Sequence, residues 1–350
     1  MSTEKIRFGI VGPGTVAHLH CRAIQQADGA RLTAIYGRDC AKAEAFASQY
    51  GLTVYTKLDE LVSSSEVDVI SIATATGTHL EIGIKAAQHG KHIICEKPLE
   101  VTPQRAEKLI SACAMHGVQL GIYFQARLDE CTRLAKEAIS SGRLGKLLFA
   151  SCQMRWYRKQ EYYDSALWRG TWALDGGGCL MNQGIHTLDL LIYLIGMPVE
   201  ISAFQGPVTH QRIEVEDNLC AIVRFENGAV GTIEASTSCS PGFPRRVEIS
   251  GENGTIVIED NRIVRWDFTE ERPEDSQIIQ KFNSDTDSVG GASDPTAIDI
   301  TGHCLLVEDF VSCVCNKTRP YIDGVEGKKA VEFVCAAYDS LKSGKAVLLR

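Results

Sequence analysis

A glycine-rich turn near the start of the chain is the first feature that could bind a ligand. Residues 12–17 read Gly-Pro-Gly-Thr-Val-Ala, directly after the strand-like run of residues 6–11 and at the start of a helix-like segment. This spacing is typical of dinucleotide-binding turns, because the glycines allow close approach of a pyrophosphate and the amides of the helix N-terminus face its oxygens. A plain glycine-rich strand–helix turn is the alternative. The candidate contacts are Gly12, Pro13, Gly14, Thr15 and Val16.

The end of the next strand-like run bears on which dinucleotide would bind. NAD-binding proteins usually carry an acidic residue there, which binds the ribose hydroxyls of the adenosine. Here Gly37 takes that place and Arg38 follows it. A small residue followed by a cation suits the 2′-phosphate of NADP, so we expect NADP, with NAD as the alternative cofactor. Arg38 could instead be a solvated loop charge, and Asp39 is better explained as a helix cap.

A lysine follows the strand-like run of residues 92–95, in the sequence Glu96-Lys97-Pro98. The carboxyl ends of strands line the ligand crevice of a doubly wound sheet, so Lys97 would lie where cofactor and substrate meet. A lysine with a lowered pKa can exchange a proton with an alcohol. Taken alone, a surface lysine at a strand end is the simpler interpretation.

An asparagine and a histidine stand four residues apart after three consecutive glycines, residues 176–178. If the segment is helical, Asn182 and His186 share one face, one turn apart. A lone histidine on an apolar helix is more often structural than catalytic, but its coincidence with Asn182 and the glycines favours a functional role. Asp189, three residues further on, could orient the His186 ring or cap a neighbouring group.

These residues fall on a regular alternation of strands and helices in the first 125 residues. Apolar runs alternate with amphipathic helical segments, which predicts an α/β fold with a doubly wound parallel sheet. Helix signals agree, since Asp39 suits the N-cap of a helix at residues 41–50 and Thr102-Pro103 suits the start of another. The apolar runs are residues 6–11, 32–36, 67–73, 92–95 and 118–123.

After about residue 125 the pattern changes to strands in quick succession. Asn227-Gly228 predicts a two-residue hairpin, because both residues accept a positive φ. An open, mostly antiparallel sheet with helices on one face would satisfy this order. The expected strands are residues 147–156, 219–226, 229–236, 247–251, 255–259 and 263–268, the expected helices are residues 129–141, 185–195, 303–314 and 325–343, and a loop is expected at residues 270–294.

The composition excludes several classes of protein. The 350 residues are 44% hydrophobic and 23% charged, which is the balance of an ordinary globular protein. With 36 Lys+Arg against 44 Asp+Glu, a net charge of −8 and no basic block, we expect no nucleic-acid partner. The longest apolar stretch, residues 188–197, is too short for a membrane span, and no signal peptide is expected. Thirteen scattered cysteines without a CxxC pair predict reduced thiols in a cytoplasmic protein rather than disulfides or a metal site.

Together these motifs resemble those of the glucose–fructose oxidoreductase and inositol dehydrogenase family, Gfo/Idh/MocA. The resemblance rests on the glycine turn, the triplet at residues 96–98 and the run at residues 176–189, and it extends over essentially the whole chain. It implies a Rossmann domain over residues 1–125 and a substrate-binding α/β domain over residues 126–350. It also implies that the open sheet of the second domain packs against another subunit, in a homodimer or homotetramer.

The resemblance implies roles for individual residues. Lys97 and His186 would contact the reacting carbinol. Many members carry aspartate where this chain has Asn182, and since an amide cannot take up a proton, Asn182 would hydrogen-bond a substrate hydroxyl. Arg127 would lie near the substrate, with a structural ion pair as the alternative. The further candidate cofactor contacts are Thr74, Thr76, His79, Glu96, Lys97, Trp168 and Arg169, of which Trp168 could equally belong to the core.

We therefore expect an NAD(P)-dependent oxidoreductase that transfers a hydride between nicotinamide and a secondary alcohol or ketone of a sugar, sugar derivative or cyclitol. Two alternatives stay open. One is a cofactor-binding regulator of the same fold without turnover. The other is a redox-neutral, NAD-dependent glycosidase that oxidises its sugar only transiently.

Overall fold

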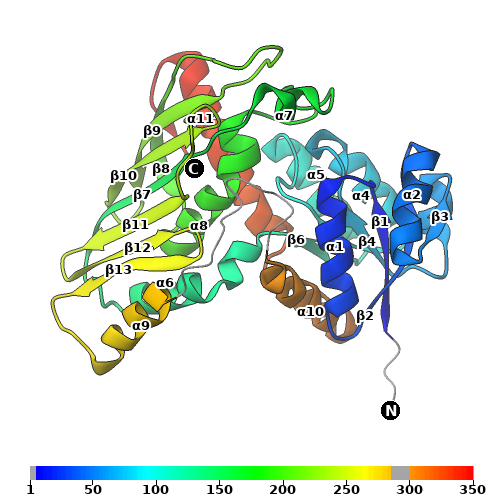
Figure 1. The fold of residues 1–350 in the computed structure, drawn as a ribbon, viewed down its shortest axis with the longest axis horizontal. Coiled ribbons are helices and arrows are strands. Elements are labelled where there is room, and N and C mark those ends of the chain that lie inside the picture. The colour runs from blue at the N-terminus through cyan, green and yellow to red at the C-terminus, as the bar shows by residue number, and fades with distance from the viewer. Residues whose placement is uncertain (1–4, 285–298, 350) are drawn as a thin grey trace. The chain divides into compact units, whose positions relative to one another are not determined.

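The computed structural model describes residues 5–284 and 299–349, and the chain forms two compact units (Figure 1). The first unit comprises residues 1–125 and 299–328, and the second comprises residues 126–298 and 329–350. The chain leaves the first unit after residue 125. It then returns to that unit at residues 299–328, which the sequence analysis did not predict.

Six parallel strands form the sheet of the first unit, in the order β3-β2-β1-β4-β5-β6. Strands β1 and β4 are neighbours although the chain between them forms β2 and β3, so the strand order reverses at β1. The carboxyl ends of strands at such a reversal flank the place where doubly wound folds bind ligands. The predicted doubly wound α/β fold is confirmed. The strands are β1 Ile6–Val11, β2 Ala30–Tyr36, β3 Thr53–Tyr55, β4 Val69–Ile72, β5 His92–Cys95 and β6 Leu120–Ile122.

The helices of this unit begin and end at local sequence signals. Asp39 caps α2, because its carboxylate accepts a hydrogen bond from the Lys42 amide at 3.1 Å, and Gly51 ends the helix with a φ of 67°. Thr102 caps α5 in the same way, accepting from the Arg105 amide at 3.3 Å. The helices are α1 Thr15–Gln26, α2 Cys40–Tyr50, α3 Leu58–Ser63, α4 His79–Gln88, α5 Pro103–Met115 and α10 Thr301–Asn316, and a 3₁₀ turn at Thr76–Thr78 precedes α4.

Eight strands form the sheet of the second unit, in the order β13-β12-β11-β7-β10-β9-β8-β14. All neighbours are antiparallel except β7 and β10, so the sheet is mixed and mostly antiparallel, as expected. The strands are β7 Leu147–Arg155, β8 Pro198–Gln205, β9 Asn218–Phe225, β10 Val230–Ser236, β11 Arg246–Gly251, β12 Gly254–Glu259, β13 Arg262–Phe268 and β14 Val347–Leu348. Along β9, buried and exposed side chains alternate, which gives the sheet a core face and an outer face.

Helices α6 and α8 pack against this sheet and against each other (Figure 1). A six-residue π-helical turn, Cys179–Gly184, leads directly into α8. The helices are α6 Glu130–Ser140, α7 Gln160–Asp164, α8 Ile185–Ile195, α9 Pro273–Ser284 and α11 Gly324–Ser343, the last of which continues from the first unit into the second.

The loop expected at residues 270–294 needs correction, because Pro273–Ser284 form helix α9; residues 285–294 lie outside the described residues. The helix is polar, so its sequence lacks a clear apolar stripe. Tertiary contacts hold it instead. Asp275 in its first turn accepts a hydrogen bond from the Trp266 indole at 2.7 Å and pairs with Arg143 at 2.7 Å.

The hairpin between β9 and β10 lies where Asn227-Gly228 predicted it, with a different turn geometry. Of the two turn residues, only Gly228 has a positive φ, at 86°. The Asn227 side-chain oxygen instead accepts a hydrogen bond from the Ala229 amide at 3.0 Å, which stabilises the turn locally.

Three further observations concern the described part of the chain. None of its helices is long and apolar enough to cross a bilayer. Within residues 5–284 and 299–349, no three His, Cys, Asp or Glu side chains are grouped as a metal site. The thirteen cysteines all fall in this part of the chain and are free thiols.

Candidate active site

The glycine turn after β1 has the geometry that a bound pyrophosphate needs. Gly12 has a φ of 104°, and a Cβ added there would lie 2.6 Å from the Ala73 carbonyl oxygen, so no other residue fits. Gly14 is the N-cap of α1 and supplies no side-chain hydrogen bond, and the first turn of α1 contains no acidic residue. The amides of this helix N-terminus therefore have no side-chain cap, and an anion is favoured there.

The structure gives Gly37 a packing role. A Cβ at this position would lie 2.7 Å from the Cδ of Pro13, so the small residue is required by the glycine turn itself. Arg38 is exposed, and no carboxylate of the described residues forms an ion pair with it. Asp39 is held in its cap on α2. The absence of an acidic residue at position 37 therefore has a steric cause, independent of the choice of cofactor.

Lys97 lies on the turn after β5, and its side chain is partly exposed. The neighbouring Glu96 is buried, with one carboxylate oxygen 3.0 Å from the Lys97 amide and the other 3.0 Å from Nε2 of His20. The second ring nitrogen of His20 lies 2.9 Å from the Ser71 hydroxyl on β4. Burial raises the pKa of Glu96, but the hydrogen bond and charge of His20 outweigh burial, and the pKa is below its ordinary value. This buried network fixes the backbone that carries Lys97.

His79 also holds this turn through hydrogen bonds to backbone carbonyl oxygens. Its ring has no exposed surface, and its nitrogens lie 3.1 Å from the Pro98 carbonyl oxygen and 3.2 Å from that of Thr74. Thr76 is also buried, with 5% of its surface exposed. The contacts of His79, Thr76 and Glu96 are thus internal to the first unit, and their expected contact with a cofactor stays a prediction.

Asn182 and His186 stand on one continuous helical segment, as assumed, although Asn182 lies in its π-helical turn and His186 in α8. Both side chains are partly exposed. The Asn182 amide donates from Nδ2 to Asp175 Oδ1 at 2.5 Å, and Oδ2 of Asp175 accepts from the Gly170 amide at 2.8 Å. This contact fixes the orientation of the amide. Its Oδ1 accepts a hydrogen bond from the Tyr162 hydroxyl at 3.4 Å.

Protein-family models match the sequence of this chain in both of its units. Residues 6–124 match the oxidoreductase family with an NAD-binding Rossmann fold, and residues 132–257 match the GFO/IDH/MocA C-terminal domain. The chain belongs to the Gfo/Idh/MocA family of oxidoreductases. The first unit is accordingly an NAD-binding Rossmann domain, and the turn at Gly12 with the N-terminus of α1 fits the pyrophosphate of the cofactor.

Several proteins resemble the chain over most of its length. The WlbA dehydrogenase from Bordetella pertussis, solved in complex with NADH and UDP-GlcNAcA, is 32% identical, with a TM-score of 0.91 over 100% of this chain and 99% of that protein. The scyllo-inositol 2-dehydrogenase (NAD(+)) of Bacillus subtilis is 25% identical, over 99% of this chain and 97% of that protein. The 2,7-anhydro-N-acetylneuraminate hydratase of Mediterraneibacter gnavus is 28% identical, over 73% of this chain and 68% of that protein.

In this Gfo/Idh/MocA chain the glycines before the π-helical turn are required by packing. A Cβ on Gly178 would lie 1.6 Å from the Glu216 carbonyl oxygen, and one on Gly177 would lie 2.2 Å from the Tyr338 hydroxyl. The buried Glu216 carboxylate accepts hydrogen bonds from the Gly178 amide at 2.9 Å, the Leu180 amide at 3.0 Å and the Tyr338 hydroxyl at 2.9 Å. Glu216 thus caps the helical segment that carries Asn182 and His186. Burial raises its pKa to about 7 in spite of these donors.

Stability is expected to fall between about pH 5 and pH 8 because of Glu216. Its pKa is raised from 4.5 to about 7 in the folded chain, so below pH 7 the folded state binds a proton that the unfolded state has lost. The contribution of this proton to the free energy of unfolding therefore decreases as the pH rises, by about 2–3 kcal/mol between pH 5 and pH 8. Urea unfolding of wild type and Glu216→Gln at both pH values measures it, since glutamine does not ionise. Equal pH dependence of the two proteins would contradict the assignment.

Arg127 forms a buried ion pair with Asp189 of α8. Arg127 Nε and Nη2 donate to the two Asp189 carboxylate oxygens at 2.9 and 2.6 Å, and 2% of each side chain is exposed. Arg127 therefore forms a structural ion pair, which was the alternative to a role in substrate binding. The expected contact of Arg127 with substrate stays a prediction. Both carboxylate oxygens of Asp189 accept from Arg127.

Trp168 and Arg169 lie together on the loop before the glycines. The Arg169 guanidinium stacks over the Trp168 ring, with its Cζ 4.6 Å from the ring centroid, and its Nε donates to the Ser165 hydroxyl at 3.1 Å. Both side chains are partly exposed, so Trp168 is not a fully buried core residue. Their expected contact with the nicotinamide stays a prediction.

Sequence reasoning missed two acidic residues of the second unit that shape this site. Asp175 orients the Asn182 amide and Glu216 caps the helical segment, but both contacts depend on residues 7 and 36–38 positions apart in the sequence. Asp175 directly precedes the three glycines, which was the one available signal. For Glu216, neither a motif nor a spacing points to its role.

Proposed function

We propose that this Gfo/Idh/MocA protein is an NAD(P)-dependent oxidoreductase that transfers a hydride between nicotinamide and a secondary alcohol or ketone of a sugar-like substrate. The observation that carries the proposal is Lys97, partly exposed on a turn that Glu96, His20 and His79 hold at the carboxyl end of β5. A regulator without turnover has no need for a lysine held in this way.

In the proposed reaction, the nicotinamide accepts or supplies the hydride when bound. The protein handles the proton of the substrate hydroxyl, and we assign this to Lys97 and His186, whose side chains can each exchange one. Asn182 cannot take up a proton, and Asp175 holds its Nδ2, so it presents its side-chain oxygen as an acceptor. Asn182 therefore binds and orients a hydroxyl group.

Substitution Asn182→Ala is expected to raise KM about tenfold or more and to change kcat less, because it removes a hydrogen bond made in the ground state as well as in the transition state. Steady-state kinetics on the preferred substrate measure the two constants separately. Asn182→Asp is the informative partner variant, since it restores an ionisable group but places it against Asp175. A strong gain in activity from Asn182→Asp would contradict the assigned role of the amide.

For the cofactor, we propose a preference for NADP over NAD that depends on Arg38. The exposed guanidinium can bind a 2′-phosphate through a charge-assisted hydrogen bond, which typically contributes about 1.5–3 kcal/mol. Gly37 supports the preference less than its position in the sequence suggested, since Pro13 requires a glycine there. The Bordetella pertussis relative was solved with NADH, so NAD is the alternative to be tested.

Substitution Arg38→Ala is expected to weaken NADP binding about ten- to hundredfold and to leave NAD binding nearly unchanged. Dissociation constants of both cofactors for wild type and variant, from calorimetric titration, decide the point. Lys42→Ala is a suitable control, because this lysine is also exposed near the start of α2 but pairs with Asp39. Equal weakening of both cofactors, or a wild type that prefers NAD, would show that Arg38 does not select the cofactor.

The substrate class is supported by the relatives. UDP-GlcNAcA is bound in the Bordetella pertussis structure, and the Bacillus subtilis relative is a cyclitol dehydrogenase by name. A screen of sugars, cyclitols and sugar nucleotides with NAD and NADP, followed at the nicotinamide absorbance, tests the proposed reaction.

A redox-neutral reaction is the second candidate function, and the hydratase from Mediterraneibacter gnavus favours it. Addition of water changes no net oxidation state, so such an enzyme turns over without net reduction of the cofactor. Substrate consumption followed by chromatography, without a change in nicotinamide absorbance, would identify this reaction.

We further propose that the outer face of the second unit's sheet joins copies of the chain into a homo-oligomer. Large apolar side chains are exposed on adjacent strands of this face, and such patches commonly mark protein interfaces. They are Phe149 on β7, Phe204 on β8, Ile222 on β9 and Val230 on β10, exposed by 59, 66, 57 and 38%.

A further inference from the structure

Two arginines of the second unit lie against one tyrosine ring. The Cζ of Arg169 is 4.1 Å from the centroid of Tyr162, and the Cζ of Arg158 is 5.8 Å from it. Arg158 also lies 5.0 Å from the centroid of Trp156. Stacking on aromatic rings holds a guanidinium in place. Arg158 Nη1 also donates to the Tyr157 carbonyl oxygen at 3.2 Å. Two positive charges therefore gather around Tyr162.

The same tyrosine connects the arginines to the site around Asn182. Its hydroxyl donates to the Asn182 side-chain oxygen at 3.4 Å and accepts from Gln183 Nε2 at 2.8 Å. Tyr162 thus has its ring against the two cations and its hydroxyl against the proposed substrate-orienting amide. The residues of this set all belong to the second unit.

The electrostatics around Tyr162 favour an anion. Arg169 Nε donates to the Ser165 hydroxyl, and no carboxylate in the described part of the second unit forms an ion pair with Arg169. Burial lowers the pKa of Arg158, and the nearby positive charge of Arg169 acts in the same direction. A bound anion would offset both the burial of the Arg158 charge and its repulsion by Arg169. The Asp175 carboxylate, which also lies near Tyr162, accepts from Asn182 and the Gly170 amide.

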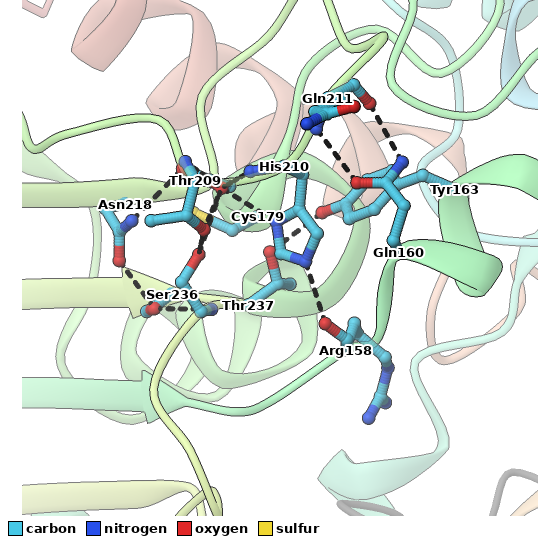
Figure 2. Close-up of polar contacts among 12 residues, drawn as sticks. Arg158, Gln160, Tyr163, Cys179, Thr209, His210, Gln211, Asn218, Ser236 and Thr237 are labelled. Carbon is cyan, nitrogen blue, oxygen red and sulfur yellow. Dashed lines mark hydrogen bonds and ion pairs between the residues drawn. The ribbon is translucent and has the colours of Figure 1, made fainter.

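The backbone of Arg158 is anchored, which fixes where its guanidinium can reach. His210 lies with Nε2 2.8 Å from the Arg158 carbonyl oxygen and Nδ1 2.7 Å from the buried Asp217 carboxylate. Gln160 and Gln211 exchange two hydrogen bonds of 2.9 Å between the same two segments. Figure 2 shows the Arg158 carbonyl within this network and the guanidinium pointing away from it.

We propose that Arg158 and Arg169 form a subsite for a negatively charged oxygen group, a carboxylate or a phosphate, of the substrate that Asn182 orients. The inference rests on the proposed function, because it places a substrate at Asn182, and it narrows the substrate class to anionic sugars. Guanidinium groups bind both kinds of oxyanion through paired N–H donors. Sugar acids carry the first and sugar nucleotides the second.

Calorimetric titration with UDP-GlcNAcA tests the subsite, using Arg158→Met and Arg169→Met as the variants that remove charge. Each is expected to weaken binding of this probe about ten- to hundredfold, and Arg158→Lys by less, since it keeps the charge. Binding to wild type should also weaken as salt is raised, and this dependence should decrease in the variants. Arg265→Met, which removes an exposed arginine paired with Asp267 on β13, is the matched control and should bind like wild type.

Further probes separate the two sources of charge. UDP-GlcNAc lacks the carboxylate, so a loss of arginine dependence with this probe assigns the subsite to the carboxylate, and a retained dependence assigns it to the phosphates. The NADH dissociation constant and the melting temperature of each variant report on the cofactor and the fold. If Arg169→Met weakens NADH instead of UDP-GlcNAcA, the arginine belongs to the cofactor site and the inference is wrong.

The inference and the proposed function fail in distinguishable ways. Turnover of neutral sugars alone, or unchanged binding of UDP-GlcNAcA by both variants, would overturn the subsite and leave the oxidoreductase function intact. Absence of binding by every anionic probe would also overturn it. Arginine-dependent binding without any nicotinamide turnover would support the subsite and contradict the proposed function.

Discussion

Substitution Lys97→Met is expected to lower kcat by about 10²–10⁴ and to leave the dissociation constant of NADH close to the wild-type value. Methionine matches the length of the lysine stem but can neither donate nor accept a proton. The turn itself should persist, because it is held by the Lys97 backbone amide on Glu96 rather than by the side chain. Steady-state turnover and a separate cofactor titration measure the two effects.

Lys85→Met is the matched control for this prediction. Lys85 lies on α4 of the same unit, and its exposed side chain pairs with Asp59 at 2.6 Å. Its removal should leave turnover within about twofold of wild type, since an exposed ion pair contributes little to stability. Near-normal turnover by Lys97→Met would remove this lysine from the mechanism.

Much of the fold could be predicted because its signals are local. The glycine turn, the helix caps at Asp39 and Thr102, and the hairpin glycine Gly228 each act through neighbouring backbone groups, and the structure contains all of them. Short apolar strands and amphipathic helices were recognisable for the same reason, since burial imposes a period on the residues of each element.

Elements held by distant partners escaped prediction. Helix α9 is polar and depends on the contacts of Asp275 with Trp266 and Arg143, of which Arg143 lies 132 positions away. Strand β8 begins with Pro198 and lies between β9 and β14, so its pairing is visible only in three dimensions. The return of residues 299–328 to the first unit is likewise a matter of tertiary packing.

The candidate site shows how chemistry and packing share the same residues. Gly37 and Gly178 stood out for their place in motifs, yet each is required because a Cβ would collide with a neighbour. His79 and Glu96 hold the turn of Lys97 from inside the unit. A motif predicts that such residues matter, but the contacts decide whether they act on a ligand or on the residues that do.

Substitution Arg127→Met is expected to destabilise the second unit by about 3–5 kcal/mol, because it removes the Arg127 ion pair from the buried Asp189 carboxylate. Urea unfolding at neutral pH measures the loss. The double variant Arg127→Met/Asp189→Leu should regain most of it, since replacing both partners by apolar groups of similar size leaves no buried charge.

The comparison between the single and the double variant separates the two interpretations of Arg127. A structural ion pair predicts that stability and activity fall together in Arg127→Met and recover together in the double variant. Position 189 lies about one turn after His186 on α8, and an apolar side chain there would pack in place and keep this part of the helix ordered. A direct contact with substrate predicts the opposite pattern. In that case the double variant is stable but keeps a raised KM, which would support the contact of Arg127 with substrate that the sequence suggested.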